Sequence, residues 1–140
     1  MTNREMVFAF IDRINAHDVD GMYTLMDKEH IFIDGIGRSI KGREAIRQAW
    51  QSYFAMIPDY WIKLERLFED EAGLAIFGKA GGTVVNEGHL DAQNRWEIPA
   101  AWLAVVESNA VILWQVFADT EPVRQIMTRT RPTMKPQGQS

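Results

Sequence analysis

The stretch HIFIDGIGRSIKGREAIRQAW, residues 30–50, contains an apolar run, an aspartate, a glycine-bearing turn and a helix-like segment in that order. Residues 30–34 are typical of a short strand, and the glycines after Asp34 indicate a turn or hairpin. Apolar residues then recur at helical spacing until Pro58 ends the helix. An aspartate directly after an apolar run allows two interpretations. The carboxylate only caps the turn, or it points into a cavity.

The segment before this stretch predicts two helices. Thr2 and Glu5 have the spacing of a capping box, and the apolar residues that follow predict a helix over about residues 3–16. Asp18 is placed to cap a short second helix.

After Pro58 the pattern changes to four strand-like runs joined by short polar turns: YWIKLERLFED, GLAIFGKAGGTVV, RWEIPAAWLAVVES and AVILWQVFAD. DTEPVRQIM then begins another helix, with Asp119 or Thr120 as its cap. Helices followed by antiparallel strands predict an α+β fold. We expect a single domain at residues 1–128 and a flexible tail at 129–140.

Composition narrows the function classes. The 140 residues are 46% hydrophobic and 24% charged, which is typical of a globular domain. The net charge of −4 gives no basic footprint for nucleic acid, and no apolar run reaches the roughly 20 residues of a membrane helix. We therefore expect neither nucleic acid nor membrane as a partner. The absence of cysteine and of a secretory leader pattern favours the cytoplasm.

The motifs of common cofactor and metal sites are also missing from the sequence. Its three histidines are too scattered for a zinc pattern, and no nucleotide-binding glycine motif is present. We expect no metal and no cofactor.

Several stretches together resemble one family: FIDRINAHDVDGMYTLM, IFIDGIG, KGREAIRQAW and WEIPAAWLAVVESNAVILWQVFADTEPVRQIM. They resemble the SnoaL-like bacterial branch of the nuclear transport factor 2-like superfamily, which includes relatives of steroid delta-isomerases and limonene epoxide hydrolases. The resemblance covers about residues 5–128, and KGREAI and WQVFADTEPVR are its most specific parts. It implies a cone-shaped, cystatin-like α+β barrel. In such a barrel a strongly curved antiparallel sheet packs on the N-terminal helices around an apolar cavity.

This implied fold gives a set of candidate cavity residues. Strand alternation places Phe32 and His30 on the same face as Asp34. The other expected lining residues are Phe10, Trp50, Phe77, Lys79, Ala100, Trp102, Trp114 and Val116. Each aromatic residue among them fits either a hydrophobic core or the wall of a ligand pocket.

The resemblance also implies where catalytic groups should lie. Asp34 matches the general base of the steroid isomerases, but their two oxygen-binding donors fall at Phe10 and at Ala100 or Trp102. The tyrosine and asparagine that hold water in the epoxide hydrolases fall at Phe32 and Asp34.

The Asp-Arg-Asp arrangement of the epoxide hydrolases falls at Gly81, Lys79 and Val116, so that triad is absent. Neither relative's full set of groups is present in this chain.

Asp34, Lys79 and His30 remain as candidate catalytic residues. Lys79 either meets Asp34, forming a base and electrophile pair, or reaches out of the mouth of the cone. His30 is either a strand-start residue or a catalyst.

These residues favour a cofactor-independent isomerase, cyclase or lyase that acts on a small apolar molecule. The alternatives are a non-catalytic ligand-binding or dimeric accessory module, and a structural domain whose own side chains fill the cone.

The opposite face of the predicted sheet carries Leu103, Val105, Leu113 and Phe117 on adjacent strands. A contiguous exposed apolar patch is unusual for a monomer. Members of the family commonly dimerise through this face, so the resemblance implies a homodimer.

Overall fold

The computed structural model describes residues 1–130, which form four α-helices and a six-stranded sheet. The elements follow in the order α1 (Asn3–Asn15), α2 (Val19–Leu25), β1 (Met26–Ile33), β2 (Ser39–Lys41), α3 (Arg43–Met56), β3 (Trp61–Glu69), β4 (Leu74–Thr83), the short 3-10 helix η1 (Ala92–Asn94), β5 (Arg95–Glu107), β6 (Ala110–Phe117) and α4 (Glu121–Thr130). The predicted α+β class is confirmed.

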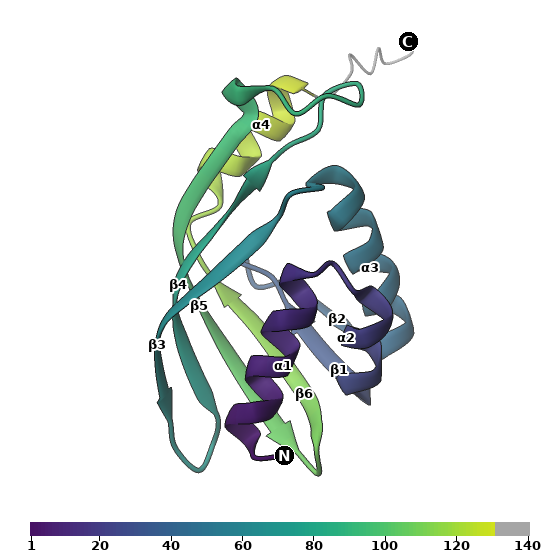
Figure 1. The fold of residues 1–140 in the computed structure, drawn as a ribbon, viewed down its shortest axis with the longest axis vertical. Coiled ribbons are helices and arrows are strands. Elements are labelled where there is room, and N and C mark those ends of the chain that lie inside the picture. The colour runs from purple at the N-terminus through teal and green to yellow at the C-terminus, as the bar shows by residue number, and fades with distance from the viewer. Residues whose placement is uncertain (131–140) are drawn as a thin grey trace.

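The sheet has the strand order β2-β1-β6-β5-β4-β3 and is strongly curved, with α1, α2 and α3 on its concave side and α4 at one end (Figure 1). Neighbouring strands are antiparallel except β1 and β6, which run parallel. The predicted curved antiparallel sheet is confirmed apart from this one pair. Parallel strands need a long connection, and here everything between β1 and β6 in the chain supplies it.

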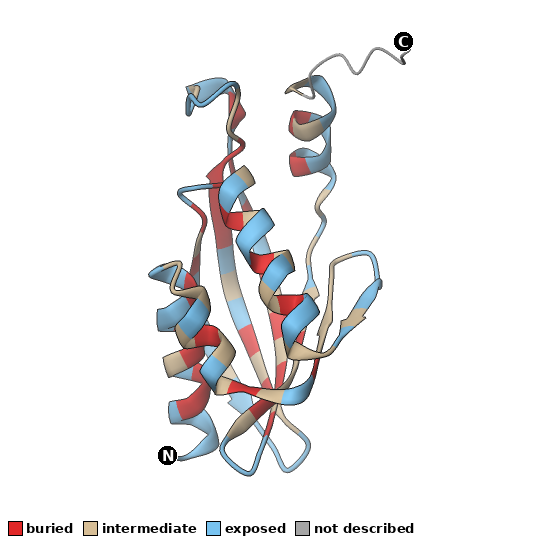
Figure 2. Ribbon diagram, turned by 90° about the vertical axis from the view of Figure 1, so that its right-hand side faces the viewer, coloured by how far each residue is buried: buried red, intermediate tan, exposed pale blue. Residues whose placement is uncertain are grey.

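The helices pack their apolar faces against the inner face of the sheet. At the start of α1, the Thr2 hydroxyl accepts a hydrogen bond from the Glu5 amide at 3.0 Å, and the Glu5 carboxylate accepts one from the Thr2 amide at 2.8 Å. This is the predicted capping box. Figure 2 shows buried residues along the sides of α1 and α3 that face the sheet. They include Phe10 and Ile14 of α1 and Trp50 of α3.

Element boundaries differ from the predictions at two places. The strand predicted at residues 30–34 begins earlier, at Met26, and ends at Ile33. The predicted tail begins inside α4, which extends to Thr130, and the rest of it, residues 131–140, lies outside the described residues. No helix of residues 1–130 is long and apolar enough to cross a membrane.

His30 is fully buried within β1, next to an irregularity in the β1–β6 register. Its Nδ1 lies 2.7 Å from the Val111 carbonyl oxygen, and its Nε2 has no hydrogen-bond partner among the described residues. Burial lowers the pKa of this imidazole, and the opposing effects of the Val111 carbonyl and of Asp27 are smaller. His30 is therefore a neutral core residue whose Nδ1–H donates to a neighbouring strand.

Acid should weaken the fold through His30. Below the ordinary histidine pKa of about 6.5 the unfolded chain binds a proton there and the folded chain does not. More protons bound in the unfolded state means that stability rises with pH. We expect the free energy of unfolding to fall by up to about 1.4 kcal/mol per pH unit between pH 6.5 and the lowered pKa.

Urea unfolding of wild type and His30→Phe at pH 7, 6 and 5 measures this contribution. The variant should lose the extra slope over this range, whereas His89→Gln, in an exposed loop, should keep it. The same pH dependence in His30→Phe and wild type would contradict the assignment.

Candidate functional site

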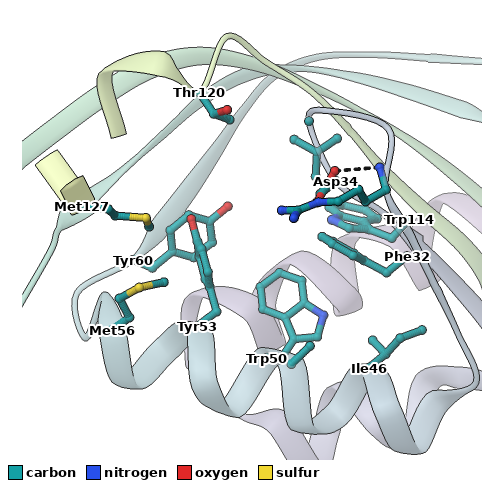
Figure 3. A pocket seen from close by; sticks show the side chains of 14 residues that line it. Phe32, Asp34, Ile46, Trp50, Tyr53, Met56, Tyr60, Trp114, Thr120 and Met127 are labelled. Atoms are coloured by element: carbon teal, nitrogen blue, oxygen red, sulfur yellow. Dashed lines mark hydrogen bonds and ion pairs between the residues drawn. The ribbon is translucent and has the colours of Figure 1, made fainter. Parts of the chain in front are cut away.

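A pocket of about 360 Å³ opens between α3, the ends of β1 and β6, and α4 (Figure 3). Its walls are mostly apolar and aromatic, formed by Phe32, Asp34, Gly35, Arg38, Ile46, Ala49, Trp50, Tyr53, Met56, Tyr60, Trp114, Val116, Thr120 and Met127. This volume lies within the usual range for small-molecule sites, roughly 300–1,000 Å³. The cone is therefore not filled by its own side chains.

Helical and strand periodicity build the aromatic wall. On α3, Ile46, Trp50 and Tyr53 recur at helical spacing and so face the same side. On the sheet, Phe32 pairs with Trp114 across the parallel β1–β6 ladder, so both side chains lie on the inner face. Phe32 also meets Trp50 edge-to-face, with ring centroids 5.8 Å apart, which connects the sheet to α3.

Asp34 both holds the turn after β1 and lines the pocket. One carboxylate oxygen accepts hydrogen bonds from the backbone amides of Ile36, at 3.1 Å, and Arg38, at 2.9 Å. The other accepts from the Arg38 Nε at 3.0 Å. The two arrangements that the sequence left as alternatives therefore occur together.

The hydrogen bonds keep Asp34 ionised. Partial burial raises the pKa of Asp34, but the Arg38 and Ile36 amides and the Arg38 guanidinium together lower it further, so the pKa lies below its ordinary value. Arg38 lines the pocket with its side chain 77% exposed, which places this ion pair at the open mouth. The pair leaves the pocket wall without net charge. Sequence reasoning missed Arg38, although its i,i+4 spacing from Asp34 across a turn was a usable signal.

Tyr53 and Tyr60 lie across the pocket from Asp34, and their hydroxyls point into it (Figure 3). Their rings meet edge-to-face with centroids 5.0 Å apart. Neither hydroxyl bonds to another residue in the described part of the chain, and both are open to the pocket and not sealed in the core. Burial raises the pKa of both phenols, and the neighbouring Tyr53 raises that of Tyr60 further, so both keep their protons at neutral pH.

These two tyrosines were missed as site residues. Tyr53 was visible only as part of an apolar helix face, and Tyr60 only as the first residue of a strand-like run. The two side chains meet only because of the way the chain turns after α3, and no local sequence pattern predicts that turn.

Five of the predicted cavity residues line the pocket: Phe32, Asp34, Trp50, Trp114 and Val116. Phe10, Ala100 and Trp102 are buried in the core next to it and do not line it. Phe10 packs on Trp114 with ring centroids 5.1 Å apart, and Trp102 stacks on the same indole at 6.2 Å.

The placement of Phe77 and Lys79 on the inner face is wrong. In β4 it is Ile76 and Ala80 that are buried, opposite Trp102 and Ile98 of β5. The side chains of Phe77 and Lys79 therefore point outward, and both are 46% exposed.

The ammonium of Lys79 lies 3.6 Å from a carboxylate oxygen of Glu97, not beside Asp34. The glycines around these residues carry no side chain to reveal which face of the strand is buried.

His30 belongs to the core and does not line the pocket. Residues 1–130 contain no group of three histidine, aspartate or glutamate side chains suited to a metal ion.

Comparison with known proteins identifies the family of the chain. The family model of the SnoaL-like domain matches residues 7–114, and the chain belongs to this family, as its resemblance predicted. No curated protein sequence matches the chain.

Solved structures share the fold. A putative polyketide cyclase from Xanthomonas campestris pv. campestris has a TM-score of 0.76 and 15% identity, covering 89% of this chain and 96% of that one. A protein of ketosteroid isomerase-like fold from Catenulispora acidiphila, in complex with trimethylamine, has a TM-score of 0.74 and 20% identity, with 87% and 91% covered. An epoxide hydrolase from M. tuberculosis, similar to limonene epoxide hydrolase, has a TM-score of 0.72 and 13% identity, with 90% and 84% covered.

Replacing Asp34 should separate its turn contacts from its charge. Asp34→Ala removes the ion pair and also the acceptor of two backbone amides, and should lower the free energy of unfolding by about 1 kcal/mol more than Asp34→Asn does. Asp34→Asn keeps an oxygen for those amides and loses only the exposed ion pair, which should cost under about 1 kcal/mol. Urea unfolding at pH 7 measures both changes. Equal destabilisation by alanine and asparagine would show that the backbone bonds contribute nothing.

Proposed function

We propose that the chain binds a small apolar molecule in this pocket and converts it without a cofactor, as an isomerase, cyclase or lyase with Asp34 as general base. The observation that carries the proposal is one ionised carboxylate on the wall of an otherwise apolar, aromatic pocket. Membership of the SnoaL-like family and the fold shared with putative polyketide cyclases support this reaction class.

The three reaction types share a first step, in which Asp34 would act as the base. The carboxylate takes a proton from a carbon next to a carbonyl, and the electron pair of that C–H bond forms the carbon–carbon double bond of an enolate. Returning the proton to a different carbon completes an isomerisation. Attack of the enolate carbon on a second carbonyl closes a ring, and loss of a leaving group from the neighbouring carbon completes a lyase reaction.

The environment of Asp34 sets limits on this chemistry. The lowered pKa keeps the base form present at neutral pH, but it also makes the carboxylate a weak base. A weak base needs either an acidic substrate carbon or strong stabilisation of the enolate oxygen. Epoxide hydrolysis does not fit, because Lys79 lies on the outer face and Val116, although in the pocket wall, is apolar.

A non-catalytic ligand-binding module is the second candidate. The observation that favours it is the full use of the Asp34 carboxylate in holding the turn and Arg38. In that case the carboxylate and guanidinium would only orient the polar end of a ligand.

Deuterium exchange of 2-tetralone separates these two functions. This bicyclic ketone is small enough for the pocket and carries exchangeable protons beside its carbonyl. In D₂O, we expect the wild-type chain to accelerate exchange, followed by proton NMR. Asp34→Asn should bind the ketone within about threefold of wild type and lose about 100-fold or more of the acceleration.

Asp12→Asn, an exposed carboxylate on α1, is the control and should leave the rate unchanged. The same rate in wild type and Asp34→Asn would contradict the role of Asp34 as base. Binding by the wild type without acceleration would instead support the ligand-binding module.

We also propose that the outer sheet face joins two copies of the chain. Phe77, Ala101 and Phe117 lie in one row across β4, β5 and β6, and the two phenylalanines are 46% and 51% exposed. Leu103, Val105 and Leu113 continue this apolar face and are half-buried. Lys79 and Glu97 border it with opposite charges, so the face is compatible with a second copy of itself.

Placing a charge on this face should separate the copies. Phe117→Lys puts an ammonium in the centre of the proposed contact, and we expect a dimer in the wild type and a monomer in the variant by sedimentation equilibrium. Phe8→Lys, at a 41% exposed phenylalanine on α1, is the control and should remain dimeric. A monomeric wild type at tens of micromolar would rule out the contact.

A further inference from the structure

The hydroxyls of Tyr53 and Tyr60 are polar groups of the pocket wall with no hydrogen-bond partner among the described residues. Tyr60 is only 8% exposed as a whole residue, but both hydroxyls lie at the pocket surface and are not sealed in the core. A tyrosine hydroxyl in an apolar wall usually has a hydrogen-bond partner, because leaving it without one is unfavourable. Two such groups converging on one apolar pocket point to a partner that occupies the pocket itself.

The protonation state of the pair defines that partner's chemistry. Both phenols are protonated at neutral pH, so each has one O–H to donate, and no acceptor near them uses it. The complementary group is an oxygen that accepts two hydrogen bonds. A carbonyl oxygen with two lone pairs meets this requirement, and an enolate oxygen meets it better because it carries charge.

The charge of the pocket favours a neutral ligand over a cationic one. The single carboxylate of the pocket is already paired with Arg38, and no further acidic side chain lines the wall. The aromatic wall alone offers only the weaker attraction of ring faces for a cation. A neutral ligand that becomes anionic during reaction therefore fits this site better than an amine does.

We infer that the hydroxyls of Tyr53 and Tyr60 form an oxygen-binding subsite, and that the ligand is an apolar ketone or related enolisable carbonyl compound. Its oxygen lies at the tyrosine pair, and the carbon beside its carbonyl lies toward Asp34, across the pocket (Figure 3). This inference rests on the proposed function and supplies the donors that Phe10 and Ala100 or Trp102 do not provide.

The subsite completes the first step of the reaction. When the Asp34 carboxylate takes the proton, the former C–H electron pair forms the new carbon–carbon double bond, and the carbonyl π electrons move to oxygen. The two phenolic protons then stabilise that oxygen without leaving their tyrosines. Hydrogen bonds that strengthen as this charge develops accelerate the step, because they favour the transition state over the bound ketone.

Binding of a matched pair of probes tests the subsite. 2-Tetralone and tetralin share one bicyclic frame and differ by the carbonyl oxygen, and isothermal titration calorimetry gives both affinities. We expect wild type to prefer the ketone, and Tyr53→Phe and Tyr60→Phe each to reduce that preference by about three- to tenfold. The affinity for tetralin should stay unchanged, which also shows that the pocket is intact.

The exchange rate of bound 2-tetralone provides a second readout. Each tyrosine variant should lower it by about 100-fold, as removal of one oxyanion donor does in other enzymes. Tyr23→Phe is the control, because this tyrosine bonds to Glu44 outside the pocket and should change neither readout.

The outcomes distinguish the inference from the proposed function. Equal wild-type affinity for ketone and hydrocarbon, or a preference that survives in the double variant Tyr53→Phe/Tyr60→Phe, overturns the oxygen-binding subsite alone. Failure of both probes to bind the wild type overturns the apolar pocket and the subsite together.

Discussion

The parallel pairing of β1 with β6 is the constraint on which the site depends. It sets Phe32 beside Trp114 on the inner face and brings Asp34, one residue beyond the end of β1, to the edge of the pocket. The chain then returns through β2 and enters α3 at Gly42, whose φ of 97° lies in the left-handed region that favours glycine. The Gly42 amide donates to the His30 carbonyl, so the strand that leads into Asp34 also positions the helix that forms the opposite wall.

Local patterns in the sequence predicted most of the secondary structure, because caps and periodicity act within a few residues. The capping box at Thr2 and the Asp18 cap are both present. Pairing between distant strands was harder to predict from the sequence. The parallel β1–β6 pair needs partners roughly 80 residues apart, and loop closure of that kind leaves no local signature. Lys79 points outward because of which face of β4 is buried. The glycines of β4 give no sign of that face, and only pairing with β5 determines it.

The same contrast between local patterns and distant pairing explains which residues of the candidate site could be predicted. Phe32, Trp50 and Trp114 could be predicted as cavity residues because each lies on the apolar face of its own element. Tyr60 could not, because it lies between α3 and β3 and enters the pocket only through the turn that joins them. The missing oxygen donors at Phe10 and at Ala100 or Trp102 made a proton-transfer site look incomplete. In the proposed oxygen-binding subsite, Tyr53 and Tyr60 from another part of the fold take that role, which sequence positions alone do not reveal.

One end of the pocket carries a carboxylate that can accept a proton, and the other carries two hydroxyls that can donate hydrogen bonds. An apolar ligand between them removes water from both groups. In the proposed reaction, a ligand that displaces water from the pocket removes solvent from the Asp34 carboxylate, and desolvation raises the pKa of a carboxyl group. The exposed Arg38 remains in contact with water and becomes no stronger as a partner. At the other end, loss of water leaves the two phenolic protons with only the ligand oxygen as acceptor. A bound ligand would thus make Asp34 a stronger base and direct both phenolic hydrogen bonds to the ligand oxygen. The same exclusion of water therefore favours both binding and proton transfer.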